Sequence, residues 1–212
     1  MEASFWHDRW NANEIGFHQS KPNALLEKYM GVLGCAEGSR IFLPLCGKTL
    51  DIGWLLAKGY CVAGAELSET AVKQLFEELG VVPDISPAGA RTRYSAPDID
   101  IFVGDIFDLS EELLGAVDAV YDRAALVALP EEMREEYVRQ VAKITDNAPK
   151  LLLTFEYDQS QLAGPPFSID EDSVRTLHSD SYRLTLLEKV QVSGGLKGRV
   201  NAEEAVWYLE KE

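Results

Sequence analysis

The 212-residue sequence predicts an α/β fold, a doubly wound and mostly parallel seven-stranded sheet with helices on both faces and an antiparallel hairpin at one edge. Two observations predict this fold. Short apolar runs alternate along the chain with segments of helical periodicity, which indicates parallel strands joined by crossover helices. The last two strand patterns follow one another without a helical segment, which indicates an antiparallel pair. We therefore expect ligands to bind beyond the carboxyl ends of the parallel strands.

The first unit of this fold runs from Arg40 to Ser68 and consists of a strand, a turn, a helix and a second strand. Gly59 ends its helix, and Ser68 then caps a further helix that Gly80 closes. The expected strands are 41–45, 61–67, 99–103, 116–121, 151–157, 182–192 and 204–210, and the expected helices that follow the first strand are 50–58, 68–79, 130–144 and 170–178.

One segment between these elements is expected to be a surface linker. Residues 82–97 carry Pro83, Pro87 and Pro97, and prolines interrupt regular structure. A short strand near Arg93 is the alternative for part of this segment.

The length and the 46% hydrophobic content suit one domain that spans residues 1–212. The formal net charge of −15 disfavours nucleic acid and anionic membrane surfaces as partners, since both attract clusters of Lys and Arg. A small-molecule substrate fits this charge better. We expect the protein to be a monomer.

Cysteine and histidine usage narrows the class of protein further. Cys35, Cys46 and Cys61 form no Cys-x-x-Cys pair, and the first residues lack a signal-peptide pattern, as is typical of a reduced, cytoplasmic protein. No apolar run approaches about 18 residues, so no membrane span is expected. The three histidines are too scattered to predict a metal site.

A carboxylate follows the second predicted strand at a spacing typical of nucleoside-binding folds. Glu66 lies 19 residues after Gly47, and an acidic residue about 20 residues beyond the glycine turn accepts hydrogen bonds from ribose hydroxyls in such folds. The alternative is that Gly47 makes an ordinary turn and that Glu66 is a surface carboxylate ahead of the helix cap at Ser68.

The turn after the first strand matches neither common phosphate-binding motif. Gly47-Lys48-Thr49 imitates the end of a phosphate-binding loop, but Phe42 stands where the first glycine is required. The three-glycine dinucleotide fingerprint is also missing. A nucleoside without phosphates, such as S-adenosylmethionine, needs only the acidic ribose ligand and a tight turn, and the sequence favours it for that reason.

Four residues from separate segments fall at the carboxyl ends of predicted strands, namely Leu45, Glu66, Asp105 and Arg123. Because these ends meet at one edge of a parallel sheet, we expect one ligand crevice there. Arg123 lies between a buried strand and the apolar run 124–129, so its guanidinium is expected to point into the crevice. A structural ion pair with a nearby carboxylate is the alternative.

Longer motifs resemble those of the bacterial thiopurine S-methyltransferases, a family of class I methyltransferases with a Rossmann-like fold. The resemblance covers essentially the whole chain, and the motifs stand in the family's order and spacing. They are FWHDRWNANEIGFHQ (5–19), FLPLCGK (42–48), GAELSE (64–69), GDIF (104–107), YDRAALVALP (121–130), EYDQ (156–159) and GPPFS (164–168).

The resemblance implies that S-adenosylmethionine is contacted by Trp10, Leu45, Glu66, Ile106 and Arg123. Residues 1–30 are expected to form a helical lid at the amino terminus, because aromatic residues are dense there and a sulfonium is attracted to aromatic rings. Trp6 lies on the same helix face as Trp10 and is expected to pin this helix to the core. Asp105 and Ile106 are expected to contact adenine.

The acceptor side is expected to be lined by Phe17 and His18, with the turn at 164–167 as the opposite rim. His18 is also a candidate to relay a proton. Lys197 and Arg199 belong to a carboxyl-terminal loop whose alignment with the family is loose, and their roles are left open. We name no catalytic residue, because aromatic heterocyclic thiols ionise more readily than cysteine.

The resemblance thus implies an enzyme that transfers the methyl group of S-adenosylmethionine to the sulfur of aromatic or heterocyclic thiols, for example thiopurines such as 6-mercaptopurine. Direct in-line displacement requires the protein mainly to align and desolvate the reacting groups. Two alternatives remain. One is a methyltransferase for another small acceptor, such as a halide, selenium or tellurium species. The other is a non-catalytic nucleoside-binding module or an NAD-dependent enzyme, which the missing glycines disfavour.

Overall fold

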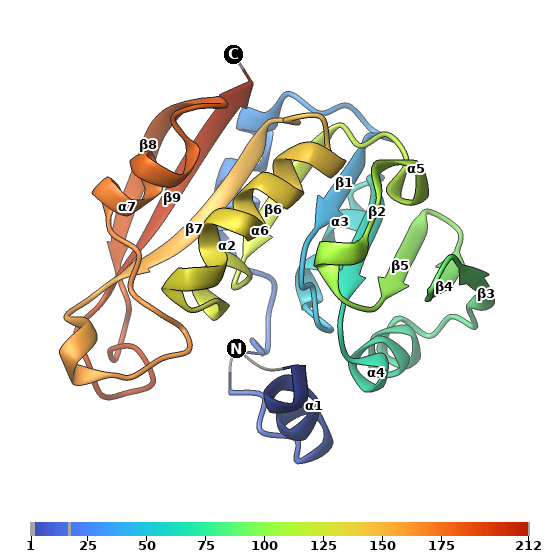
Figure 1. Ribbon diagram of the computed structural model, residues 1–212, viewed down its shortest axis with the longest axis horizontal. Helices are drawn as coiled ribbons and strands as arrows, with labels where there is room; N and C mark the ends of the chain where they lie inside the picture. The colour runs from blue at the N-terminus through green and yellow to red at the C-terminus, as the bar shows by residue number, and fades with distance from the viewer. Residues whose placement is uncertain (1–2, 17, 212) are drawn as a thin grey trace.

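The computed structural model describes residues 3–16 and 18–211, and a mixed sheet of nine strands lies at its centre (Figure 1). Five parallel strands, in the order β5-β2-β1-β6-β7, form the middle of the sheet. In that order their bounds are Ile99–Val103, Cys61–Glu66, Arg40–Leu43, Ala119–Arg123 and Lys150–Glu156. The strand order reverses at β1, so the carboxyl ends of β1, β2 and β6 meet at the switch point.

An antiparallel hairpin extends the sheet at each edge. β8 (Tyr182–Gln191) and β9 (Glu203–Lys211) pair beside β7, which confirms the predicted closing hairpin. β3 (Asp84–Ala88) and β4 (Arg91–Ala96) pair beside β5, so the expected number of seven strands was wrong and the expected linker contains a hairpin. Pro87 lies within the outermost strand β3, where a missing N–H can face solvent.

Helices cover both faces of the sheet. Leu26, Leu55 and Phe76 pack on one face, and Tyr137 and Val141 pack on the other. The first face is covered by α2 (Ala24–Tyr29), α3 (Leu50–Ala57) and α4 (Glu69–Leu79), and the second by α5 (Glu111–Leu114), α6 (Glu131–Ile144) and α7 (Glu171–His178). Short 3₁₀ turns occur at η1 (Met30–Leu33), η2 (Ile106–Asp108), η3 (Leu126–Ala128) and η4 (Gln159–Gln161).

Capping residues set the ends of α3 and α4, the helices that follow β1 and β2. The side chain of Thr49 accepts a hydrogen bond from the Asp51 N–H at the start of α3. The Ser68 hydroxyl accepts one from the Ala71 N–H at the start of α4, and Gly80 ends that helix with a φ of 70°, as the sequence predicts. These caps leave the loops between strand and helix short and well defined.

The helix α1 (Ala3–Asn11) lies outside the two helix layers, at the bottom of the view in Figure 1. It contacts α4, and Trp10 is its one buried residue within the described part of the chain. This helix therefore lies across the carboxyl ends of the strands rather than on a face of the sheet.

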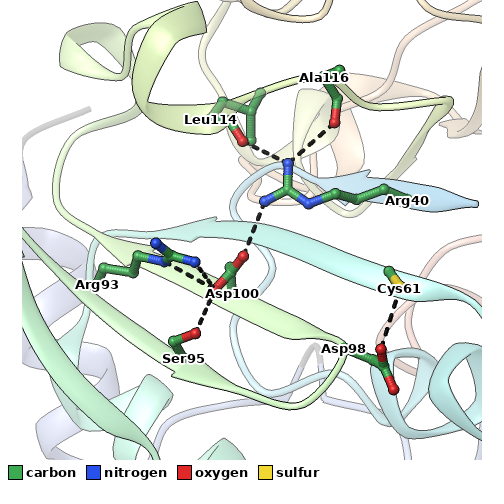
Figure 2. A network of polar contacts seen from close by, with 8 residues as sticks. All are labelled: Arg40, Cys61, Arg93, Ser95, Asp98, Asp100, Leu114 and Ala116. Atoms are coloured by element: carbon green, nitrogen blue, oxygen red, sulfur yellow. Dashed lines mark hydrogen bonds and ion pairs between the residues drawn. The ribbon is translucent and has the colours of Figure 1, made fainter.

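A network of charged groups lies at the amino-terminal ends of the parallel strands β1 and β5, away from their carboxyl ends (Figure 2). The Arg40 guanidinium on β1 donates to the carbonyl oxygens of Leu114 and Ala116 and to the Asp100 carboxylate on β5, the last at 3.2 Å. Asp100 also accepts hydrogen bonds from Arg93 and Ser95 of β4. Residues 116–118 were expected to begin β6 but bind Arg40 instead, so the strand starts at Ala119.

Candidate active site

A cavity of about 500 Å³ lies at the carboxyl ends of β1, β2 and β6, a volume typical of small-molecule sites. The turns that follow β1 and β2 form two of its walls. Helix α1 and the loop around residue 165 form two more. Six of the sequence-predicted residues line it, namely Trp10, His18, Leu45, Glu66, Ile106 and Arg123. Asp105, also expected at this crevice, lines the cavity too, and Phe17 lies outside the described residues.

Glu66 is at the centre of the cavity wall. Only 5% of its surface is exposed, so the alternative of a surface carboxylate is wrong. One carboxylate oxygen accepts a hydrogen bond from the Gly47 N–H at 2.7 Å, and the other accepts one from the Ser68 N–H at 2.8 Å. Burial raises the pKa of Glu66, while these two backbone bonds act against that shift. A carboxylate has about four lone-pair sites, so Glu66 can accept a further hydrogen bond from a ligand.

The turn after β1 combines two residues in the left-handed region, Leu45 with a φ of 47° and Gly47 with a φ of 53°. Between them, the Cys46 N–H donates to the Ala65 carbonyl at 3.0 Å and ties this turn to β2. The thiol of Cys46 is buried, and burial followed by the charge of Glu66 raises its pKa well above the usual value. Lys48, which would bind phosphate in a phosphate-binding loop, donates instead to Glu78 at 2.7 Å.

Trp10 covers this turn from the side of α1. Its exposed fraction is 4%, and a Cβ placed on Gly47 would lie 3.0 Å from Cζ2 of the indole. The absence of a side chain at Gly47 therefore lets the indole lie against the turn. Trp6, expected to pin the helix to the core, is half-buried and also lines the cavity, where its ring meets that of Phe5 edge-on at 5.2 Å.

The turn η2 forms another wall of the cavity. Asp105 and Ile106 both line the cavity, as the sequence predicts. Ile106 is 3% exposed, and the exposed Asp105 carboxylate caps the turn by accepting from the Phe107 N–H at 3.1 Å. Gln140 of α6 donates to the Ile106 carbonyl at 2.9 Å, and Arg91 of β4 donates to the Asp105 carbonyl. The turn is thus held from both sides.

Arg123 ends β6 and lines the cavity, as the sequence predicts. Its neighbour Asp122 is fully buried on the other face of the sheet, where its carboxylate accepts hydrogen bonds from the Tyr137 hydroxyl at 2.7 Å and the Leu126 N–H at 3.1 Å. The two adjacent charges therefore do not pair with each other. Within residues 3–16 and 18–211, no other carboxylate forms a direct ion pair with Arg123.

His18, Pro165 and Pro166, which the sequence analysis expected on the acceptor side, all line the cavity. Burial, followed by the charge of Lys48, lowers the pKa of His18, so the imidazole is neutral near pH 7. The peptide bonds before both prolines are cis. Lys197 donates to the Pro165 carbonyl at 2.6 Å and also lines the cavity.

Sequence reasoning missed Glu204, which lines the same cavity from β9. Burial raises its pKa, and the charge of Arg123 acts in the opposite direction. Because β9 runs antiparallel to β7, its first residues lie at the edge where β7 ends. No local motif marks this position, since only the pairing of distant strands brings it to the site.

In the described part of the chain, residues 3–16 and 18–211, no group of three or more His, Cys, Asp and Glu side chains is arranged to hold a metal ion. Among the helices of this part of the chain, none has the length and apolar character that crossing a bilayer requires.

Comparison with known structures supports the fold assignment. A 1,6-didemethyltoxoflavin-N1-methyltransferase from Burkholderia thailandensis, solved with bound 1,6-didemethyltoxoflavin and S-adenosylhomocysteine, superposes with a TM-score of 0.66 over 99% of this chain and 87% of its own, at 12% identity. A SAM-dependent methyltransferase from Methanosarcina mazei superposes with a TM-score of 0.65 over 90% of this chain and 99% of its own, at 14% identity. The fold is that of the class I methyltransferases.

Comparison of sequences identifies the family. The family model described as thiopurine S-methyltransferase (TPMT) matches residues 1–212. A thiopurine S-methyltransferase from Xanthobacter autotrophicus is 55% identical over 100% of both chains, and one from Acinetobacter baylyi is 44% identical over 99% of this chain and 98% of its own. Together with the fold, these matches show that the chain belongs to the thiopurine S-methyltransferase family, enzymes that use S-adenosylmethionine as methyl donor.

Proposed function

We propose that this cavity binds S-adenosylmethionine through Trp10, Leu45, Glu66, Ile106 and Arg123 and methylates the sulfur of an aromatic or heterocyclic thiol such as 6-mercaptopurine. The observation that carries the proposal is the arrangement of Glu66, Gly47 and Trp10. The buried carboxylate holds the glycine turn, and the indole lies against that turn. A carboxylate and an aromatic face thus border one cavity.

The residues present fit this cofactor. Glu66 has spare lone pairs in a buried setting, and these suit the two hydroxyls of a ribose. Ile106 offers a flat apolar surface to adenine, while Leu45 contributes an apolar wall. The ring of Trp10 attracts a sulfonium by cation–π interaction. When bound, S-adenosylmethionine supplies a methyl group on a sulfonium sulfur, which is itself a good leaving group.

The chain's part in catalysis is then to position and desolvate the acceptor sulfur. The reaction is an in-line displacement at the methyl carbon, and proximity of the two reacting atoms contributes much of the rate enhancement. Val127, Phe155 and Pro166 provide an apolar surface on the acceptor side. The neutral imidazole of His18 and Phe17, which lies outside the described residues, complete the proposed substrate contacts. We propose no metal and no covalent intermediate.

The amino-terminal segment is the proposed lid over this site. Trp6, Arg9 and Trp10 of α1 line the cavity. In α2 the situation differs, since Leu25 and Leu26 belong to the core. Within residues 1–30, the closing element is therefore α1 and the chain that follows it.

Two measurements test the proposed function. Isothermal titration should show binding of S-adenosylmethionine and S-adenosylhomocysteine, and little binding of NAD or ATP. A radiolabelled methyl-transfer assay with 6-mercaptopurine should give S-methyl product in the presence of EDTA. Binding without transfer to any aromatic thiol would favour the other acceptors, and the same assay with iodide, selenite and tellurite would identify them.

A further inference from the structure

Glu204 is an acidic side chain on the acceptor side of the cavity. It pairs with Phe155 in the register of β7 and β9, and both residues line the cavity. Its neighbour Glu203 lines a different hollow on the surface, together with Tyr157 and Asp170. The two consecutive glutamates therefore serve different surfaces, and only Glu204 faces the proposed acceptor.

The surroundings of Glu204 leave its carboxylate able to accept a proton from a ligand. Burial raises its pKa, whereas the charge of Arg123 and hydrogen bonding with the Asn23 side chain favour the ionised form. Asp51 is the other acidic group that acts on it, and both Asp51 oxygens already accept hydrogen bonds, one from the Asn23 N–H at 2.7 Å and one from the Tyr121 hydroxyl at 3.1 Å. Asp51 is thus committed to the protein, and of these two acids Glu204 is the one that lines the cavity.

Arg123 and Glu204 line one cavity and attract each other without forming a direct ion pair in the described residues 3–16 and 18–211. A ligand in this cavity can therefore meet both a cation and a carboxylate. Heterocyclic thioamides match this pair, because in the thione form they carry an N–H beside the C=S group. The N–H suits a carboxylate, and the electron-rich sulfur suits a guanidinium.

We propose that Glu204 accepts the ring N–H proton of the methyl acceptor, so that the preferred substrates are heterocyclic thiones with an N–H adjacent to the C=S group. The proposal rests on the proposed S-methyltransferase function and specifies its substrate class. A sulfur lone pair forms the new bond to the methyl carbon, and the bond from that carbon to the sulfonium breaks with its electrons left on the departing sulfur. The N–H proton passes to Glu204, and the N–C=S group becomes N=C–S–CH₃.

The first test compares two acceptors in three proteins. With 6-mercaptopurine, which has the N–H, Glu204→Gln should lower kcat/KM at least about tenfold, because an amide cannot take the proton. With thiophenol, which lacks an N–H, the same variant should stay within about threefold of the wild type. Glu203→Gln is the matched control, since that side chain lies on the other surface, and it should leave both activities unchanged.

A second test uses the wild-type protein and measures binding instead of activity. With S-adenosylhomocysteine present, isothermal titration compares 1-methylimidazole-2-thione, which keeps one N–H, with 1,3-dimethylimidazole-2-thione, which has none. The first should bind at least about tenfold more tightly, because the second offers the half-buried Glu204 carboxylate no N–H. In Glu204→Gln this preference should shrink.

The outcomes separate this proposal from the proposed function. Equal losses on 6-mercaptopurine and thiophenol in Glu204→Gln would show that Glu204 only supports the fold or Arg123, and would overturn the proton-acceptor role. Equal affinity of the two imidazole thiones for the wild type would overturn it independently of any variant. Failure of the wild type to methylate either aromatic thiol would instead reject the proposed function itself.

Discussion

The Glu66 carboxylate accepts a hydrogen bond from the Gly47 N–H at 2.7 Å, although 19 residues separate the two. With its other oxygen Glu66 binds the Ser68 N–H. One buried side chain thus joins the turns after β1 and β2, which are the two turns that meet at the switch point. Glu66, the residue proposed to bind the ribose, therefore also holds the two turns of the site together.

Removal of this carboxylate should affect both ligand binding and stability. Glu66→Ala should weaken S-adenosylmethionine at least about tenfold, since charge-assisted hydrogen bonds contribute about 1.5–3 kcal/mol each. Glu66→Gln should lose less, because its amide keeps one acceptor oxygen. S-adenosylhomocysteine should weaken in parallel, since the ribose is common to both ligands. Isothermal titration checks these affinities, and an unchanged dissociation constant in a folded Glu66→Ala protein would remove Glu66 from the binding site.

Gly47→Ala should weaken cofactor binding because its Cβ would displace the Trp10 indole. The substitution also places a side chain at a φ of 53°, which costs about 1–2 kcal/mol in the left-handed region. Gly80→Ala is the matched control, since Gly80 has a φ of 70° and nothing within 4 Å of its added Cβ. Both substitutions should lower the melting temperature, but only Gly47→Ala should weaken the binding of S-adenosylmethionine, as measured by isothermal titration. Equal affinities for the two would contradict the role of Trp10.

Deletion of residues 1–19 should abolish turnover and leave a folded core. The deletion removes α1 with Trp10 but keeps Asn23, whose side chain caps α2. Circular dichroism should show a cooperative unfolding transition, while the methyl-transfer assay should show no product. An unfolded truncated protein would place α1 in the core, and full turnover would make the lid dispensable.

Asp100→Asn should lower stability without changing cofactor affinity. The network in Figure 2 lies at the amino-terminal ends of β1 and β5, whereas the cavity lies at the carboxyl ends of the parallel strands. The expected loss is about 1–3 kcal/mol, from weakened charge-assisted bonds to Arg93 and Arg40. Glu135→Gln on an exposed face of α6 should change stability by less than about 0.5 kcal/mol. Urea unfolding measures both variants.

The loss of stability in Asp100→Asn should disappear in acid. Burial opposes ionisation of Asp100, but hydrogen bonds from Ser95 and Arg93 prevail and lower its pKa in the folded protein. A depressed folded pKa stabilises the protein above the unfolded value, which is about 3.9 for Asp, and this contribution is lost as the pH falls through the folded pKa. The free energies of unfolding of wild type and Asp100→Asn should therefore converge below about pH 4. A constant difference across that range would contradict the pKa shift.

The sequence was most informative where a site residue belongs to a local unit. Glu66 and Gly47 lie on one strand–helix–strand unit, and their spacing predicted a nucleoside site there, although not the hydrogen bond between them. Arg123 was predicted from its place after a buried strand, and it lines the cavity.

Residues and strands that depend on distant pairing were harder to predict. Glu204 reaches the cavity only because β9 pairs antiparallel with β7, a relation that no local pattern encodes. The strand near Arg93, left open as an alternative, is β4 (Arg91–Ala96). Its partner β3 was missed for a different reason, since Pro87 reads as a strand breaker unless the strand is known to lie at an edge.

The buried thiol of Cys46 bears on how this protein avoids modifying itself. The side chain lines the cavity in which we propose that a methyl electrophile is held. Thiolates, not thiols, react with such electrophiles, and burial together with the charge of Glu66 keeps Cys46 in the thiol form. The carboxylate proposed to bind the ribose thus also helps to hold this cavity thiol in its less reactive form. Chemical selectivity among sulfur atoms in this site then depends on ionisation as well as on distance.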